Sequence, residues 1–209
     1  NRGIHDPLYC RCASFYDGQN RVVIISNDLV TMDPERAWDV RREISSSGKV
    51  PPENIMLCGS HTHAGPTISK GIGWGEVDPE FVKNWQETAC RMALAAIADE
   101  TPVEMVCGAA ALIKKIGYNR VWADGPTDPE IRWAAFRAAD HTVKLLIHNH
   151  AMHGVVFGRS MWQVSADWPG AVNCALLEQN FAKHVMFLQG AAGDINPGPP
   201  CCLSLSDGE

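Results

Sequence analysis

The chain has 209 residues, 45% hydrophobic and 20% charged, which is ordinary for one globular domain with a sizeable core or at most two small domains. A formal net charge of −6 and a pI near 5.7 argue against a general nucleic-acid-binding protein, which would carry a basic stripe. No apolar run approaches the roughly 20 residues that span a bilayer. The first residue is Asn1 rather than Met, so we expect a piece of a longer or processed protein.

Eight cysteines are spread along the chain without a CxxC pair, which is a poor signature for a zinc finger. Free cysteine often packs as a small hydrophobic residue, so we expect most of these side chains to be buried. The pattern leaves their redox state and the cellular compartment open. The cysteines are Cys10, Cys12, Cys58, Cys90, Cys107, Cys174, Cys201 and Cys202.

Apolar and β-branched runs predict a series of strands along the chain. Asp17-Gly18 is a strong turn signal between the first two runs, and Asp140-His141 is a plausible hairpin turn that favours antiparallel pairing later on. The predicted strands cover residues 8–15, 21–28, 54–58, 103–116, 131–138, 142–149 and 185–188.

Three helices are predicted from their start signals. Asp33-Pro34 and Asp78-Pro79 each place a capping residue before a proline, and a third helix begins at Asp167. The stripes expected to face the core are Ala37, Val40 and Ile44, then Phe81, Trp85, Ala89, Met92 and Ala96, then Val172, Ala175 and Leu176. With no internal repeat, the sequence predicts a layered single domain of the α/β class, with mixed β-sheets flanked by helices.

A pair of histidines follows the strand over residues 54–58. Successive side chains on a strand point to opposite faces, so His61 and His63 project from the same face, and two neighbouring imidazoles at a strand end suit a divalent metal such as zinc. Alternatively, both side chains merely hydrogen-bond within a loop. His148, His150 and His153 cluster at the end of another apolar strand, and we expect one of them to be functional and the others to pack.

Further polar residues lie at other strand ends. Asp194 and Asn196 sit on a glycine-rich turn whose backbone amides can hold an oxyanion, although the same residues serve ordinary turns. Arg120 follows a predicted strand and either fixes a polar group of a substrate or is a solvated surface residue. Asp28 either orients a metal-bound histidine or caps a turn.

Several segments, in this order, resemble the N-terminal domain of the neutral (non-lysosomal) ceramidase family. The most specific are HTHAGP at residues 61–66 and GAAGDINP at residues 190–197. The resemblance implies a zinc-dependent hydrolase that cleaves the N-acyl (amide) bond of a ceramide-like lipid to a fatty acid and a sphingoid base. The resembling segments are residues 3–9, 26–30, 60–66, 119–120, 149–158, 165–170 and 190–197.

The resemblance also implies roles for individual residues. It places His61 and His153 as ligands of Zn2+, His63 beside the reacting carbonyl, and Arg120 near the substrate. Well-characterised members carry Ser where this chain has Asn196, so a role for that hydroxyl does not carry over.

The family's remaining zinc ligands, a Glu and a Tyr, come from later sequence. We therefore expect residues 1–198 to be a partial catalytic domain and residues 199–209 an irregular tail. Two other interpretations remain: a non-catalytic or inactive metal-binding or structural fragment, and a family member that hydrolyses a different amide or ester. A secreted or membrane-surface location rests on the resemblance alone. The expected partner is a small-molecule or lipid amide substrate.

Overall fold

The computed structural model describes residues 3–72, 74–122, 124–158 and 162–198, and the tail predicted at 199–209 lies outside them. Within the described residues the chain forms three α-helices and nine strands, together with a short 3-10 turn, η1 (Pro52–Asn54). The helices are α1 (Pro34–Ser45), α2 (Pro79–Ala98) and α3 (Asp167–Glu178). The strands are β1 (Cys10–Tyr16), β2 (Arg21–Asn27), β3 (Ile55–Gly59), β4 (Glu104–Ala111), β5 (Gly117–Asn119), β6 (Glu130–Arg137), β7 (Val143–His150), β8 (His184–Gln189) and β9 (Ile195–Pro197).

The strands form two main sheets and one short ribbon. The first sheet has the order β1-β2-β3, with β1 antiparallel and β3 parallel to β2. The second has the order β4-β6-β7-β8, in which only the β7-β8 pair is parallel. The ribbon pairs β5 with β9 in antiparallel fashion. The predicted mixed α/β fold and the antiparallel β6–β7 hairpin are therefore confirmed.

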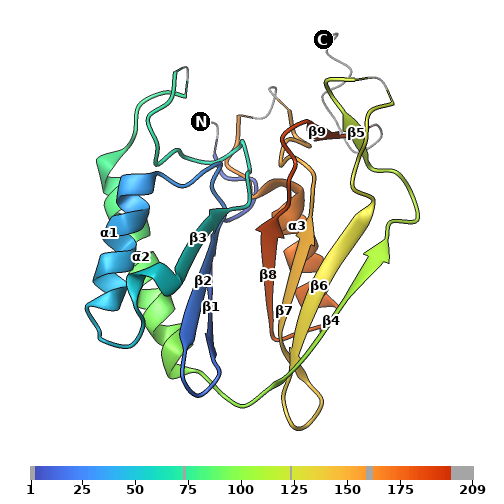
Figure 1. Ribbon diagram of the computed structural model, residues 1–209. Coiled ribbons are helices and arrows are strands. Elements are labelled where there is room, and N and C mark those ends of the chain that lie inside the picture. The colour runs from blue at the N-terminus through green and yellow to red at the C-terminus, as the bar shows by residue number, and fades with distance from the viewer. Residues whose placement is uncertain (1–2, 73, 123, 159–161, 199–209) are drawn as a thin grey trace.

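The two sheets pack face to face between layers of helix (Figure 1). Because successive strand residues face opposite sides, Val23 and Ile25 of β2 pack toward α1 and α2, while Ile24 packs toward the second sheet. In the second sheet, Met186 faces the first sheet and Phe187 packs edge-on against Trp168 of α3. The layer order is therefore helices, sheet, sheet, helix.

A buried hydrogen bond joins the two sheets near the end that carries the histidines. The hydroxyl of Ser26 in β2 donates to the carbonyl oxygen of Phe187 in β8 at 2.6 Å. Since both groups are buried and so removed from water, this bond satisfies polar atoms that would otherwise be costly. It fixes the spacing of two sheets whose strand ends supply different parts of the candidate site.

The predicted helix starts are confirmed, but the predicted α2 stripe is only partly right and the α3 stripe is wrong. Asp33 and Asp78 cap α1 and α2 through backbone amides of the first turn, and the α1 stripe is buried as expected. Helix α2 buries Trp85 and Ala89 as predicted, but its other buried residues are Val82, Ala93 and Ile97 rather than Met92 and Ala96. Alanines and other apolar residues lie on several sides of this helix. The spacing of apolar residues alone therefore does not fix how the helix is rotated about its own axis.

Helix α3 turns a partly polar face inward, where the sequence pattern predicted an apolar one. Val172 is 37% exposed, whereas Asn173 is buried against His148 of β7, whose Nε2 lies 2.9 Å from the Asn173 side-chain oxygen. This hydrogen-bonded pair makes the polar face compatible with the interior. The buried residues of α3 are Asp167, Pro169, Gly170 and Asn173.

The expectation that most cysteines are buried is wrong for the six that the structure describes. Cys107 and Cys174 are exposed, the other four are half-buried, and all six are free thiols. None of the helices in the described part of the chain is long and apolar enough to span a membrane.

We predict that Asp78→Ala lowers the free energy of unfolding by about 1 kcal/mol. The Asp78 carboxylate accepts from the backbone amides of Glu80 at 2.9 Å and Phe81 at 3.2 Å, and alanine leaves both donors without that acceptor. Asp78→Asn keeps an oxygen acceptor and is the matched control, expected to lose clearly less. Urea denaturation measures both variants, and an equal loss in the two would contradict the capping role.

Candidate metal centre

The first pair of histidines lies in the loop after β3 rather than on the strand. β3 ends at Gly59, and His61 has a φ of +65°, a left-handed conformation that is uncommon outside glycine. The prediction that strand alternation places His61 and His63 on one face is therefore wrong in its cause. The loop itself brings the two rings together, with their centroids 4.9 Å apart.

This loop docks against the loop after β7 through backbone contacts. Thr62 and Gly154 form a parallel β-bridge, and the amide of His63 donates to the carbonyl of Gly154 at 3.1 Å. A side-chain carbon at position 154 would lie 2.8 Å from the carbonyl oxygen of His61, closer than real contacts of this kind. Glycine at 154 is therefore what lets the two loops approach.

The second loop carries His153, which is held by hydrogen bonds to Ile195 and to Trp168. The amide of His153 donates to the carbonyl of Ile195 at 2.9 Å, and its ring Nδ1 lies 3.1 Å from the same oxygen. The indole N–H of Trp168, at the start of α3, donates to the carbonyl of His153 at 2.8 Å. One histidine is thus fixed from β9 on one side and from α3 on the other.

The three rings converge on a common point. One ligand-capable nitrogen from each of His61, His63 and His153 lies within 4.8 Å of the other two. The Nε2 atoms of His61 and His63 are 3.4 Å apart, and the ring centroids of His61 and His153 are 4.6 Å apart. The rings of His61 and His153 therefore lie close enough to reach one common point.

Hydrogen bonds at Nδ1 fix the tautomers of two of these histidines. Nδ1 of His61 lies 2.6 Å from the carbonyl oxygen of Val30, and a carbonyl only accepts, so this nitrogen carries the proton. The same argument applies to Nδ1 of His153 against Ile195. Each ring then presents the lone pair of Nε2 to the common point, which is the usual arrangement of a metal-ligating histidine.

The donor set fits a divalent transition metal. Two nitrogens that bind one tetrahedral zinc at about 2.0–2.1 Å lie roughly 3.4 Å apart, and the two Nε2 atoms of His61 and His63 have this separation. Neutral imidazoles suit zinc and its neighbours in the first transition series better than magnesium or calcium. The described residues therefore form a group of three histidines that can hold a metal ion.

The site keeps His63 and His153 uncharged near neutral pH. The pKa of His63 is lowered to about 4. The largest cause is the loss of solvent around its ring, and repulsion from His61, His153 and Arg120 adds to it. Part of the His63 side chain is nevertheless exposed. Burial, and then the neighbouring His61, also lowers the pKa of His153. Neutral rings are the form that binds a metal.

Three further residues were predicted to take part in catalysis, and the structure places them on or beside the β5–β9 ribbon. Arg120 is exposed and donates to the carbonyl of Gly193 at 2.7 Å, with its charge close enough to lower the pKa of both His63 and His153.

The carboxylate of Asp194 accepts from the side chain of Asn119 at 2.7 Å. Asn196 lies in β9, and its side-chain oxygen is buried without a hydrogen-bond partner among the described residues. The catalytic roles of Arg120, Asp194 and Asn196 stay predictions.

Neither of the other clustered histidines joins the group, and Asp28 has a different task. His148 pairs with Asn173, and Nδ1 of His150 lies 3.0 Å from the carbonyl of Glu130. Asp28 accepts from the amide of Tyr9 and forms an ion pair with Arg11 at 2.8 Å. The carbonyl of Val30, rather than Asp28, orients the ring of His61. Every residue has a backbone carbonyl, so the sequence gives no sign of which one takes this role.

Comparison with solved structures finds this fold in neutral ceramidases. A ceramidase complexed with C2 superposes with a TM-score of 0.83 at 20% sequence identity, over 93% of this chain and 34% of that chain. The crystal structure of neutral ceramidase from Pseudomonas aeruginosa gives a TM-score of 0.82 at 20% identity, over 99% of this chain and 36% of that one. No protein-family model and no curated protein sequence matches the chain. The likeness is one of fold, and the chain spans about a third of the length of these structures.

We predict that Gly154→Ala weakens zinc binding at least about tenfold, the scale seen when groups that orient metal ligands are displaced. The added methyl group would force the His61 loop away from the His153 loop. Gly193→Ala is the control, because a side-chain carbon there meets nothing within 4 Å and its φ is not left-handed. Competition with a chromophoric chelator measures the affinity, and equal affinities in the two variants would contradict this account of the loops.

Proposed function

We propose that this chain is part of the catalytic domain of a zinc-dependent hydrolase that cleaves the N-acyl bond of a ceramide-like lipid to a fatty acid and a sphingoid base. The observation that carries the proposal is the convergence of His61, His63 and His153 at the meeting point of two loops. The shared fold with neutral ceramidases supports the reaction class. The sequence resemblance in the HTHAGP and GAAGDINP stretches supports it independently.

His61 and His153 are the proposed zinc ligands. Both have Nδ1 hydrogen-bonded to a backbone carbonyl, so Nε2 is the nitrogen whose lone pair can bind the ion. Zinc bound there would supply a Lewis acid that polarises an amide carbonyl and makes water more acidic. The carbonyls of Val30 and Ile195 would keep the two rings from turning, which preserves the geometry through the reaction.

His63 and Arg120 are the proposed substrate-contacting groups. His63 is the most exposed of the three histidines, so it can meet a substrate carbonyl at the open side of the group. Hydrogen bonding from its ring would stabilise the developing oxyanion or deliver a proton to the leaving amine. The guanidinium of Arg120, beside Gly193, would position a polar part of the substrate.

The competing proposal is a domain that binds metal without catalysis. Elemental analysis combined with a hydrolysis assay over a panel of N-acyl amides and esters separates the two. Zinc in the purified chain together with zinc-dependent amide cleavage supports the hydrolase. Zinc without cleavage of any compound in the panel supports the non-catalytic domain, and preferential ester cleavage supports a different substrate class.

We predict that His61→Ala lowers the zinc content from about one ion per chain to nearly none, because one of two oriented imidazole ligands is lost. His184→Ala is the matched control, since that histidine is exposed at the start of β8. Elemental analysis after gel filtration measures both variants. If His61→Ala held as much zinc as the unmodified chain, the ion would have to bind elsewhere.

We predict that His63→Ala keeps the zinc content but lowers amide hydrolysis about 10²- to 10⁴-fold, the usual contribution of a positioned acid–base group. The measurement pairs elemental analysis with initial rates on an N-acyl substrate. Loss of zinc together with activity would instead make His63 a third ligand, and an unchanged rate would remove it from the reaction.

A further inference from the structure

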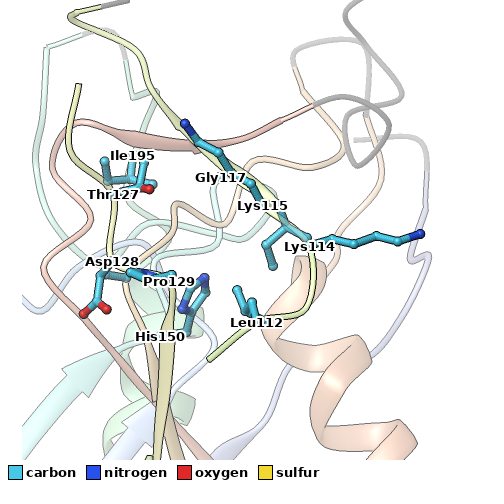
Figure 2. Close-up of a pocket in the computed structure, with 11 residues that line it drawn as sticks. Leu112, Lys114, Lys115, Gly117, Thr127, Asp128, Pro129, His150 and Ile195 are labelled. Atoms are coloured by element: carbon cyan, nitrogen blue, oxygen red, sulfur yellow. The ribbon is translucent and has the colours of Figure 1, made fainter. Parts of the chain in front are cut away.

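A cavity of about 230 Å³ lies next to the histidine group but is lined by other residues (Figure 2). Its walls come from the turn between β4 and β5, from residues 127–129 before β6, and from the end of β7. Ile195 of β9 completes the wall on the side of His153, whose ring is bonded to the Ile195 carbonyl. Nothing in the proposed hydrolysis uses this space.

The buried polar group of the cavity is the ring of His150. This residue is 3% exposed, and Figure 2 shows its ring standing at the base of the cavity with a nitrogen directed into it. Nδ1 lies 3.0 Å from the carbonyl of Glu130, so it carries the proton. Nε2 therefore has a lone pair and can accept a hydrogen bond. A ligand in the cavity would satisfy it with a hydrogen-bond donor.

The charged residues at the rim do not form a clamp for an anion. In Figure 2 the ammonium groups of Lys114 and Lys115 and the carboxylate of Asp128 all point away from the His150 ring. Asp128 is already paired with Arg132 at 2.6 Å. The remaining lining is the hydroxyl-bearing Thr127, Gly117 and the apolar residues Leu112, Ile116, Pro129, Ala151 and Ile195.

We propose that this cavity is a binding site for a small neutral molecule with an apolar body and one hydroxyl group, which donates to Nε2 of His150. Apolar walls with few polar groups are typical of small-molecule sites. An apolar cavity of about 150 Å³ holds benzene, so this one has room for an aromatic ring or short alkyl chain together with its hydroxyl. The site does not depend on the metal or on the proposed hydrolysis.

The test is a titration of the whole chain with benzyl alcohol, followed by amide chemical shifts in ¹H–¹⁵N spectra. We expect saturable shifts at Leu112, Gly117, Ala151 and Ile195, which line the cavity. Benzyl methyl ether has the same ring but no hydroxyl donor, and we expect it to bind about tenfold more weakly, as the loss of one hydrogen bond implies.

Two variants identify the cavity as the place of binding. Leu112→Trp fills the cavity and should abolish the saturable shifts, whereas Ile113→Trp changes the neighbouring, fully exposed residue and should leave them unchanged. His150→Phe keeps an aromatic ring but removes the acceptor, so it should remove the preference for the alcohol over the ether.

Three results would overturn the proposal. The first is the absence of saturable shifts up to the solubility limit of benzyl alcohol. The second is undiminished binding in Leu112→Trp, which would place the probe elsewhere. The third is equal affinity for the alcohol and the ether in the unmodified chain, which would remove His150 from recognition. Because Leu112→Trp acts at the half-buried rim, the test does not depend on whether His150→Phe folds.

Discussion

The candidate site depends on the contact between the loops that follow β3 and β7. These strands belong to different sheets, so their ends meet only because the sheets pack face to face (Figure 1). The bridge between Thr62 and Gly154 then joins the loops directly. Without the close approach that Gly154 permits, His61 and His153 would belong to two unrelated strand ends.

The chemistry of the group follows from how each imidazole is held. Backbone carbonyls of Val30 and Ile195 accept from Nδ1 of His61 and His153, which leaves both Nε2 atoms facing the same point. Crowding and burial keep the rings of His63 and His153 neutral by lowering their pKa. A close cluster of imidazole nitrogens suits a cation better than an anion, so the group can hold a metal ion.

Much of the framework was predictable from local patterns. Asp-Pro pairs mark helix starts because capping and the fixed φ of proline act within a few residues, and both marked helices were found where expected. The longer strands and the β6–β7 hairpin follow from β-branched runs and a turn, whereas the short strands β5 and β9 were not predicted. The rotation of α2 and the inward face of α3 were not predictable, because tertiary contacts such as Asn173 with His148 decide them.

For the site, the histidine motifs were visible in the sequence but their geometry was not. Alternation along a strand suggested the right pair, His61 and His63, for the wrong reason, since the loop and not β3 brings the rings together. The choice of His153 came from the family resemblance, because the sequence pattern alone left open which of the three clustered histidines is functional. The carbonyls that orient the rings, and the cavity around His150, arise from chain segments far apart in sequence and leave no local signal.

The most direct test of the central claim is X-ray absorption at the zinc edge of the zinc-loaded chain. The account predicts a first shell of nitrogen and oxygen at about 2.0–2.1 Å, with the outer-shell scattering of at least two imidazole rings. A first shell dominated by sulfur at about 2.3 Å would place the ion on cysteines and contradict the account. A chain that retains no zinc would contradict it equally.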